Sequence, residues 1–553
     1  MLLTGADIII ECLKEQKVDT IFGYPGAAVL HIYDALYKNK KHIQHVLTAH
    51  EQGAAHAADG YARSTGKVGV CIATSGPGAT NLVTGIATAY MDSIPMVVIT
   101  GNVPKHLLGK DSFQEVDITG ITAPITKHSY IVDNAEELAD ITRDAFIIAK
   151  SGRPGPVLID IPKDVAIDKA EYISKIIDVQ KINDNITEDS LFTALNLIQE
   201  SKKPFIYVGG GVVRSDASKE LLTFAEKVNA PVTSSLMGLG GFPGDHELFT
   251  GMIGMHGTKT SNLGVMECDL IIAIGARFSD RVVGNLAKFA PKAKVLHMDI
   301  DPAEINKNMP THHHIIGDAK EILKRLNDRI LSKHRPDWIN KIKNYKEKYP
   351  LEYNGTGLKA QYIIEKLSEL TDDNTIITTE VGQHQMWTAQ HYTFTRPKEL
   401  LTSGGLGTMG YGLGAAIGAQ IANPKSKVIN IAGDGCFKMN LIELATAVNY
   451  NLPIIILLID NNVLGMVKQW QALFFDQRYS ETTLDHTTNF VGLAENFGMK
   501  GYAIHHKKDV ETVLQKALNS HEPVLIHCKI PSDEKVFPMV APGQAINALI
   551  TED

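Results

Sequence analysis

The chain has 553 residues, of which 44% are hydrophobic and 21% are charged, and its formal net charge at pH 7 is -8. At this length a single hydrophobic core is excluded, and about three domains are expected. The acidic balance, with no basic stripe, excludes nucleic acid and an anionic membrane surface as expected partners. No apolar stretch reaches the roughly 18 residues of a membrane-spanning helix, so no membrane is expected.

The five cysteines are scattered, odd in number and without a CxxC spacing. Reduced thiols and a cytoplasmic location are therefore expected. The opening stretch "MLLTGADIIIECLKEQKV" has no basic leader, and its pattern predicts an amphipathic helix from the start.

Three successive segments repeat a short β-branched run, a glycine turn and a helical pattern. This alternation predicts stacked βαβ units with parallel sheets. The runs of the first segment lie at residues 68–76, 94–101 and 153–165, those of the second at 203–211, 268–280 and 293–302, and those of the third at 374–382, 427–435, 453–462 and 523–530.

Two stretches separate the segments. Polar, charged sequence at residues 175–190 predicts a linker, and a lysine-rich helical pattern covers residues 334–350. We therefore expect an α/β protein with three doubly wound parallel-sheet domains, at residues 1–168, 188–335 and 355–553.

Three consecutive histidines, in "THHHIIGD" at residues 311–318, suggest a metal site at first sight. On an extended chain they would point to alternating faces, so they cannot converge on one ion without a special turn. We expect a solvated loop instead.

An acidic residue stands where a buried strand is expected to end. Asp434 lies between two glycines directly after an apolar run, and Asn461 follows the next one. Ligands of parallel sheets bind at the carboxyl edge of the strands, and glycines let the backbone approach them. A carboxylate, an amide oxygen and a backbone carbonyl suit Mg²⁺ held partly by substrate phosphates. The alternative is a turn in which Asp434 caps the next helix.

The spacing of "GDG" to "NN" resembles the thiamin-diphosphate fingerprint, in which these residues anchor the diphosphate through Mg²⁺. The resemblance implies that Asp434, Asn461 and the carbonyl of Val463 are metal ligands. Gln383 and His384 follow another apolar strand, where a turn can offer donors to phosphate, although ordinary polarity at a helix start is the alternative. The other cofactor contacts implied in this segment are Met409, Gly435 and Met466.

Glu51 opens a helical pattern rich in alanine and glycine, which implies a helix packed tightly against another surface. An N-terminal acid favoured by the helix dipole is the alternative. Residues 48–63 and 73–101 resemble the pyrimidine-binding domain of thiamin-diphosphate enzymes. The resemblance implies that Glu51 bonds N1′ of the aminopyrimidine and favours the imino tautomer that removes the thiazolium proton, with Gly26 near the thiazolium. The cofactor then carries the difficult chemistry.

Met409 matches the large apolar residue that bends the cofactor in this family, although a core methionine that fills a gap is also possible.

Apart from linkers, the whole chain resembles the catalytic large subunits of the acetohydroxyacid (acetolactate) synthase family. The stretches that carry this resemblance lie at residues 22–28, 112–122, 244–259, 276–285 and 464–480.

This resemblance implies two linked steps. Pyruvate is decarboxylated on thiamin diphosphate, and the hydroxyethyl carbanion then attacks a second 2-oxo acid. Pyruvate as acceptor gives 2-acetolactate and 2-oxobutyrate gives 2-aceto-2-hydroxybutyrate, the first common step of branched-chain amino acid biosynthesis.

Four substrate contacts are implied by matched position. Phe113 would flank the pyruvate methyl group, and Gln114 would bond near the reacting carbon. Arg281 would meet the acceptor carboxylate, which suits the fork of a guanidinium. Trp470 would form the pocket for the larger acceptor, with a core tryptophan as the alternative.

The middle segment is similar to the flavin-binding domain of the biosynthetic enzymes. A glycine-rich turn at residues 207–213 is a weak nucleotide signal alone, but "GMIGMHGTK" and "ARFSDR" accompany it. The resemblance implies FAD in a structural or ancestral role, because the net reaction changes no oxidation state. The implied contacts are Gly210, Gly211, His256, Gly257, Arg277 and Asp299.

Four positions depart from the family pattern. Ala27 replaces a glycine and could crowd the cofactor, Gly414 replaces a proline, Cys436 replaces a serine, and Lys438 is a further departure. None removes a catalytic group. They affect the expected rate and selectivity, not the expected reaction.

Other functions remain open. An FAD-dependent pyruvate oxidase would share both cofactors but consume oxygen or quinone. Glyoxylate carboligase lacks the glutamate found here as Glu51. A nucleotide-binding module with an inactive thiamin site, or a scaffold for a regulatory partner, would be non-enzymatic.

Family geometry also implies an assembly. Glu51 and the diphosphate site (Asp434, Asn461) lie on different domains and would meet across an interface, so a homodimer or homotetramer is expected. A small regulatory subunit is a possible further partner. Residues 536–550 would close over the site as a lid, with a terminal amphipathic helix as the alternative.

Overall fold

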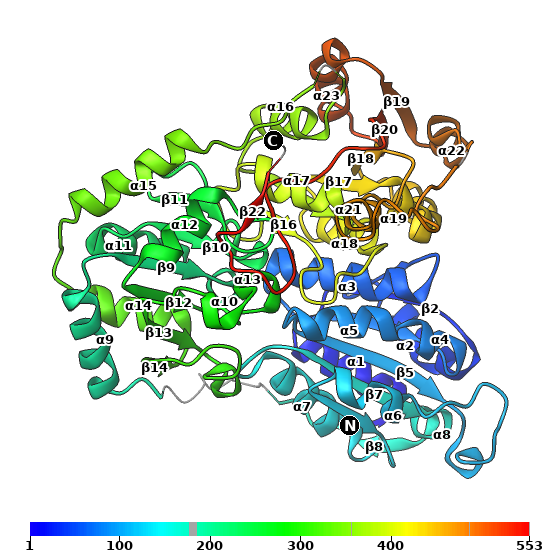
Figure 1. The fold of residues 1–553 in the computed structure, drawn as a ribbon. Coiled ribbons are helices and arrows are strands. Elements are labelled where there is room, and N and C mark those ends of the chain that lie inside the picture. Colours follow the sequence, from blue (N-terminus) through cyan, green and yellow to red (C-terminus); the bar gives the residue numbers. More distant parts are fainter. Residues whose placement is uncertain (176–184, 356, 486, 552–553) are drawn as a thin grey trace.

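The structure is a computed structural model that describes residues 1–175, 185–355, 357–485 and 487–551. Most of the predicted linker, residues 176–184, lies outside the described residues. Within them, three six-stranded parallel sheets follow one another along the chain, each flanked by helices (Figure 1). The predicted fold class is therefore confirmed, and we name the three units the N-terminal, central and C-terminal domains.

The N-terminal sheet has the order β3-β2-β4-β5-β7-β6. In β4, Cys71 packs into one hydrophobic core while Val70 and Ile72 pack into another on the opposite face. Burial on both faces requires the continuous apolar runs seen in the sequence. The elements are β1 (Leu2–Thr4), α1 (Gly5–Glu15), β2 (Thr20–Tyr24), α2 (Leu30–Lys38), β3 (Gln44–Leu47), α3 (Glu51–Thr65), β4 (Gly69–Ala73), α4 (Pro77–Asn81), α5 (Val83–Met91), β5 (Met96–Asn102), α6 (Ile118–Thr122), β6 (His128–Ile131), α7 (Leu138–Lys150), β7 (Pro156–Pro162), α8 (Lys163–Ile167) and β8 (Lys169–Glu171).

The central sheet has the order β11-β10-β9-β12-β13-β14. Its strands and helices are α9 (Glu188–Glu200), β9 (Pro204–Val208), α10 (Gly210–Arg214), α11 (Ser218–Val228), β10 (Val232–Ser234), β11 (Phe249–Met252), α12 (Lys259–Glu267), β12 (Leu270–Ile274), α13 (Asp280–Val283), β13 (Lys294–Asp299), β14 (His313–Ile316) and α14 (Ala319–Asn327), followed by α15 (Pro336–Lys348).

The C-terminal sheet has the order β16-β15-β17-β18-β20-β19. Its elements are α16 (Ala360–Leu370), β15 (Thr375–Thr379), α17 (Gln383–His391), β16 (Leu400–Leu401), α18 (Tyr411–Ala422), β17 (Lys427–Gly433), α19 (Asp434–Asn440), the 3₁₀ turn η7 (Leu441–Glu443), α20 (Leu444–Asn449), β18 (Ile455–Asp460), α21 (Gly465–Phe474), α22 (Phe490–Phe497), β19 (Lys500–Ile504), α23 (Val510–Leu518), β20 (Val524–Lys529), β21 (Met539–Val540) and β22 (Leu549–Ile550).

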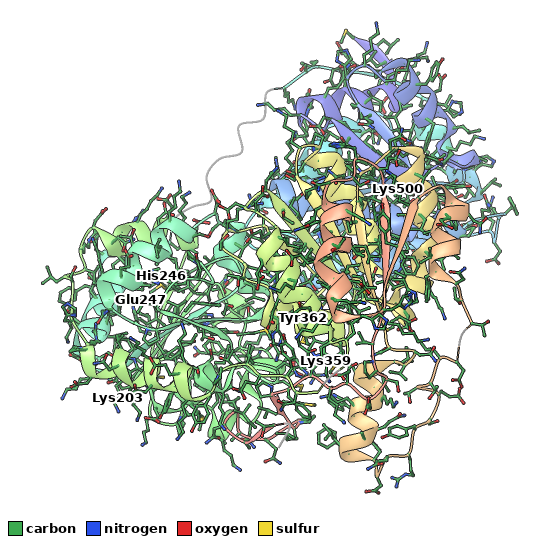
Figure 2. The ribbon with its side chains drawn as sticks, turned by 90° about the horizontal axis from the view of Figure 1, so that it is seen from above. Lys203, His246, Glu247, Lys359, Tyr362 and Lys500 are labelled. Atoms are coloured by element: carbon green, nitrogen blue, oxygen red, sulfur yellow. The ribbon has the colours of Figure 1, made fainter. Side chains whose placement is uncertain are left out.

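Figure 2 shows the central domain, marked by Lys203 and His246, beside the C-terminal domain, marked by Tyr362 and Lys500. The lysine-rich stretch before the C-terminal domain forms α15, as predicted. Its Trp338 is buried and donates a hydrogen bond to the Pro204 carbonyl at 2.9 Å, so this helix packs on the central domain.

Two local predictions are wrong. The first helix does not begin at the first residues, because β1 pairs antiparallel with β8, and Thr4 then caps α1 by accepting from the Asp7 N–H. The histidine stretch is not a solvated loop, because its residues from His313 onward form β14 at the edge of the central sheet. In both cases the sequence does not show the distant strand that supplies the hydrogen bonds.

The N-terminal and C-terminal domains meet through α3 and α18, which lie side by side (Figure 1). A Cβ on Gly60 would overlap the Ala415 carbonyl oxygen, and one on Gly418 would overlap that of Ala57. The predicted tight packing of the helix that begins at Glu51 is therefore present, with α18 as its partner.

We expect Gly418→Ala to lower the free energy of unfolding by about 1–3 kcal/mol, since the new methyl would force two helix backbones apart. Urea denaturation measures this change. Helix propensity alone predicts the opposite sign, a gain of about 0.5–1 kcal/mol. A more stable variant would therefore contradict the close approach.

Candidate active site

Two predicted metal ligands lie together at the carboxyl edge of the C-terminal sheet. Strands β17 and β18 are parallel neighbours, and Gly433 is in register with Ile459. Asp434 is the first residue of α19 and Asn461 directly follows β18, and both are buried. Parallel strands that end side by side thus bring the carboxylate and the amide to one place.

The turn after Asn461 presents the third predicted ligand. The Asn461 Nδ2 donates to Gln383 Oε1 at 3.0 Å, which orients the amide, and its Oδ1 accepts from the Val463 N–H at 3.3 Å. Backbone bonds from Leu464 to Thr482 and from residue 484 to residue 462 hold the turn. Neither bond uses the Val463 carbonyl, which is the group predicted to face the metal.

His384 supplies a buried donor next to this edge. Its Nε2 is buried and has no hydrogen-bond partner within residues 1–175, 185–355, 357–485 and 487–551. Burial lowers the pKa of His384 to about 3, so the imidazole is neutral. A Cβ on Gly433 would lie 2.7 Å from His384 Nδ1, so the glycine before Asp434 makes room for this ring. A neutral imidazole with an unpaired nitrogen fits a phosphate oxygen as partner.

Gln383 is placed differently from His384. Its Nε2 donates to the Glu534 carbonyl at 2.7 Å and to Gln469 Oε1 at 3.1 Å, while its Oε1 accepts from Asn461. In this structure its carboxamide connects the predicted metal ligand to the C-terminal segment.

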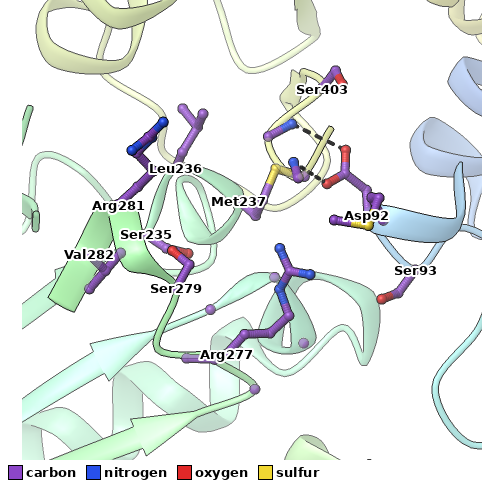
Figure 3. Close-up of a pocket in the computed structure, with 18 of the residues that line it drawn as sticks. Asp92, Ser93, Ser235, Leu236, Met237, Arg277, Ser279, Arg281, Val282 and Ser403 are labelled. Carbon is purple, nitrogen blue, oxygen red and sulfur yellow. Dashed lines mark hydrogen bonds between the residues drawn. The ribbon is translucent and has the colours of Figure 1, made fainter. Parts of the chain in front are cut away.

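A cavity of about 1100 Å³ opens beside this edge, between the three domains (Figure 3). This volume lies just above the roughly 300–1,000 Å³ of typical small-molecule sites. The predicted site residues that line it are Gly210, Gly211, His256, Arg277, Arg281, Asp299, Met409, Met466 and Trp470.

The predicted acceptor residues meet across two domains. Arg281, on α13 of the central domain, has its guanidinium carbon 6.0 Å from the ring centroid of Trp470, on α21 of the C-terminal domain. The Arg281 side chain is 62% exposed and its Nη1 pairs with the Asp280 carboxylate at 3.2 Å, so a substrate carboxylate would meet an exposed guanidinium beside this ion pair. Cation–π contact of this kind orients a guanidinium without using its N–H groups.

The central-domain lining includes a second unpaired imidazole. His256 Nδ1 is buried without a hydrogen-bond partner among the described residues, and burial lowers the pKa of His256 to about 4. Gly257, in contrast, does not line the cavity. A Cβ there would lie 2.6 Å from the Met252 carbonyl oxygen, so this glycine serves a tight turn.

The other predicted residues gather on the N-terminal domain, around the turn that leads into α4. Glu51 Oε2 accepts from Asn81 Nδ2 at 3.0 Å. A Cβ on Gly76 would lie 2.8 Å from the Gln114 carbonyl oxygen, and one on Gly26 would lie 2.5 Å from Thr74. Phe113 is 88% exposed beside Gln114.

The described residues that line the cavity include none of these four, Gly26, Glu51, Phe113 and Gln114. One chain therefore carries two separate groups of predicted site residues. One lies around the cavity, and the other lies at the start of α3 and α4.

Among the cavity residues that were not predicted, Asp92 and Arg214 stand out by their contacts. Asp92 accepts from the backbone N–H groups of Gly404 and Gly405, at 3.2 and 2.7 Å, as the dashed lines of Figure 3 mark. Arg214 donates to the Asp92 carbonyl at 2.9 Å. Asp92 thus joins all three domains. In the sequence, Asp92 is a single acidic residue directly after an apolar helical pattern. Such a residue looks like any ordinary helix end, so no local pattern identifies it.

The structure shows the surroundings of three of the four departures from the family pattern. Ala27 is exposed and begins a short 3₁₀ turn. A Cβ on Gly414 would lie 2.7 Å from the His56 Cβ, so this glycine permits the close packing of α3. The Cys436 Sγ donates to the Val381 carbonyl at 2.8 Å.

The C-terminal segment, residues 536–550, is not a helix and consists of two short strands separated by turns. Gln469 Nε2 donates to the Val536 carbonyl at 3.0 Å, and the Val540 N–H donates to the Met255 carbonyl at 2.8 Å. Strands β21 and β22 then pair antiparallel. In Figure 1 this red segment runs from the C-terminal domain to the central domain. The alternative of a terminal amphipathic helix is therefore wrong for this segment.

Neither a long apolar helix nor a carboxylate-rich metal cluster is present in the described residues. Among the described helices, none combines the length and the hydropathy of a membrane-spanning segment. The same residues hold no group of three or more His, Cys, Asp or Glu side chains placed for a metal ion. The predicted magnesium site is of a different kind, with one carboxylate.

Comparisons with known proteins agree with this architecture. The family described as "Thiamine pyrophosphate enzyme, N-terminal TPP binding domain" matches residues 3–121. The corresponding central domain matches residues 191–326, and the corresponding C-terminal TPP binding domain matches residues 380–528.

Curated relatives match over the whole length. The chain is 46% identical over 550 residues to the acetolactate synthase isozyme 2 large subunit of Escherichia coli (strain K12), covering 99% of each chain. It is 48% identical over 565 residues to the probable acetolactate synthase large subunit of Methanocaldococcus jannaschii, covering 99% of this chain and 95% of the other. It is 43% identical over 562 residues to the acetolactate synthase large subunit of Haemophilus influenzae, covering 99% and 98%. The chain therefore belongs to the thiamine pyrophosphate enzyme family and, within it, to the acetolactate synthase large subunits.

Proposed function

We propose that the protein is a thiamin-diphosphate-dependent acetolactate synthase, which joins pyruvate to a second molecule of pyruvate or to 2-oxobutyrate with loss of CO₂. The observation that carries this proposal is that Arg281 and Trp470 line one cavity together with Met409 and Met466, and that α21, which carries Met466 and Trp470, begins four residues after Asn461. A carboxylate acceptor would find a guanidinium and an apolar ring next to the cofactor site. The relatives' names support the synthase over the pyruvate oxidase.

The residues at the sheet edge fit a magnesium diphosphate group. Asp434, Asn461 and the Val463 carbonyl would hold Mg²⁺, and His384 would donate to a phosphate oxygen. Gly435, Met409 and Met466 border the same place. Thiamin diphosphate, when bound, supplies the nucleophilic carbon and accepts the electron pair left by CO₂. The chain's own part is to hold it, to exclude water and to move a proton at Glu51.

FAD is proposed for the central-domain side of the cavity. The glycine turn at Gly210 and Gly211 borders it, and His256 contributes an unpaired buried nitrogen. Arg277 and Asp299 lie on the same lining. The flavin would stabilise the fold here, since joining two 2-oxo acids with loss of CO₂ transfers no electrons to it.

A homodimer or homotetramer is proposed because one chain keeps the two groups of site residues apart. Glu51 and Gln114 would serve the diphosphate edge of a second copy, and the exposed Phe113 ring would be covered there.

A small regulatory subunit is proposed from the large-subunit names of the relatives. A cytoplasmic location is proposed because the five cysteines are buried and unpaired.

The experiment is to supply purified protein with pyruvate, thiamin diphosphate, Mg²⁺ and FAD while acetolactate and dissolved oxygen are followed together. Acetolactate without oxygen loss supports the synthase. Oxygen loss with little acetolactate would indicate the pyruvate oxidase instead. If neither acetolactate nor oxygen loss were detected, both functions would be rejected.

Trp470→Leu is expected to lower the preference for 2-oxobutyrate over pyruvate by about 10-fold, because one methylene in an apolar pocket is worth about 10–200-fold in discrimination. The ratio of the two products in a competition assay measures this. Phe474→Leu is the matched control, because it alters the ring packed 5.7 Å from Trp470 on the same helix without lining the cavity. An unchanged ratio in Trp470→Leu would assign this tryptophan to packing alone.

A further inference from the structure

A buried carboxylate of the C-terminal domain holds the loop that precedes Glu51. Glu443 ends η7 and is fully buried. Its Oε2 accepts from the Ala49 N–H at 3.1 Å and its Oε1 accepts from the His50 N–H at 3.0 Å. Thr446 Oγ1 donates to the same carboxylate at 2.6 Å. The loop between β3 and α3 therefore depends on a residue almost 400 positions away.

A second side chain of the same segment holds the start of this loop. The Tyr450 hydroxyl accepts from the Leu47 N–H at 2.7 Å. Three backbone donors, from Leu47, Ala49 and His50, thus bond to side chains of the C-terminal domain. Charge-assisted bonds to a buried carboxylate are stronger than the neutral bond to the tyrosine, so Glu443 is the main anchor.

The first turn of α3 rests directly on this carboxylate. A Cβ on Gly53 would overlap Glu443 Oε1, so only glycine lets the helix approach this closely. His50 caps α3 by accepting from the Gln52 N–H through its Nδ1. A carboxylate at the positive end of a helix is also electrostatically favourable.

We propose that Glu443 is a positioning residue for Glu51. Glu51 is the first residue of α3, so the two bonds to Ala49 and His50 set where its carboxylate stands. Proton transfer requires the carboxylate within hydrogen-bond reach of the pyrimidine, and a misplacement of about 1 Å costs about 100-fold. This inference rests on the proposed function, in which Glu51 moves a proton on thiamin diphosphate.

The test compares Glu443→Gln and Glu443→Ala with the unaltered protein. A glutamine keeps one acceptor oxygen and an alanine keeps none, so the loss should be graded. We expect the rate of C2-proton exchange of bound thiamin diphosphate, and kcat, to fall about 10-fold in Glu443→Gln and about 100-fold in Glu443→Ala. The KM for pyruvate and the Kd for the cofactor should stay within about 3-fold, because the groups that bind them are untouched.

A readout without cofactor is hydrogen–deuterium exchange of the backbone amides. The peptide covering residues 47–54 should exchange faster in both variants, since the Ala49 and His50 amides lose their acceptor.

Glu399→Gln is the matched control. Glu399 is also buried in the C-terminal domain and accepts from two backbone N–H groups, those of Thr395 and Arg396, near the end of α3 opposite Glu51. It should lower stability without changing C2-proton exchange. If the Glu443 variants fail to fold, Tyr450→Phe leaves Glu443 intact and removes the two bonds of the Tyr450 hydroxyl, which accepts from the Leu47 N–H at 2.7 Å and donates to the His45 carbonyl at 3.5 Å. This variant should slow C2-proton exchange about 2-fold to 10-fold.

The outcomes separate the two proposals. Wild-type C2-proton exchange in both Glu443 variants, in a protein where Glu51→Gln abolishes it, would overturn the positioning role. Exchange that persists in Glu51→Gln would instead reject the proton-transfer role of Glu51. If C2-proton exchange fell equally in Glu399→Gln, the effect of the Glu443 variants would be assigned to lost stability and not to the positioning of Glu51.

Discussion

Replacing Glu51 by glutamine is expected to lower kcat for acetolactate formation by about 10²–10⁴-fold, which is the range contributed by a positioned general acid or base. Glutamine has nearly the same shape and can still accept from Asn81 Nδ2, as the carboxylate does at 3.0 Å. What it loses is the ability to take up a proton. The Kd for thiamin diphosphate, measured by fluorescence titration in the presence of Mg²⁺, should change by less than about 3-fold.

The control separates proton transfer from helix stability. Glu188 is likewise the first residue of a helix, α9, and its carboxylate pairs with Arg329 on the surface. Glu188→Gln removes an acid from a helix start without touching the site, so kcat should not change. Turnover in Glu51→Gln that equals wild type would leave Glu51 with the helix-dipole role alone.

Replacing Asp434 by asparagine is the second large effect expected. Asp434 contributes the one charged oxygen of the predicted ligand set, since Asn461 and the Val463 carbonyl are neutral. Outer partners of a metal site contribute about 10–100-fold to affinity, so loss of a direct charged ligand should cost more than about 100-fold. The measurement is the Kd for thiamin diphosphate by isothermal titration calorimetry at several Mg²⁺ concentrations.

Cys436→Ser is the matched control for Asp434→Asn. It alters the same helix, and a hydroxyl can still donate to the Val381 carbonyl as the Sγ does. The cofactor affinity should stay within about 3-fold. If Asp434→Asn kept the wild-type affinity at every Mg²⁺ concentration, Asp434 would be a helix-start residue and no metal ligand.

The sheet edge could be predicted because its signal is local. Each strand is a short apolar run bounded by glycine or asparagine, so β17 and β18 appear in the sequence almost as they do in the structure. The parallel βαβ pattern then requires their carboxyl ends to be neighbours, which brings Asp434 and Asn461 together. A helix start at Glu51 was predictable for the same reason.

The sequence by itself determined the fold class, the strands and the residue types at the cofactor edge, because these follow from patterns within about 30 residues. Only the tertiary structure decided that α3 packs on α18, that Asp92 joins three domains, that Glu443 holds the loop before Glu51 and that the C-terminal segment forms a pair of short strands instead of a helix. Each of these depends on the burial or the hydrogen-bond partner of a group far away in the chain. Periodicity and spacing carry no information about such a partner, since the free energy of the contact exists only once both parts have folded together.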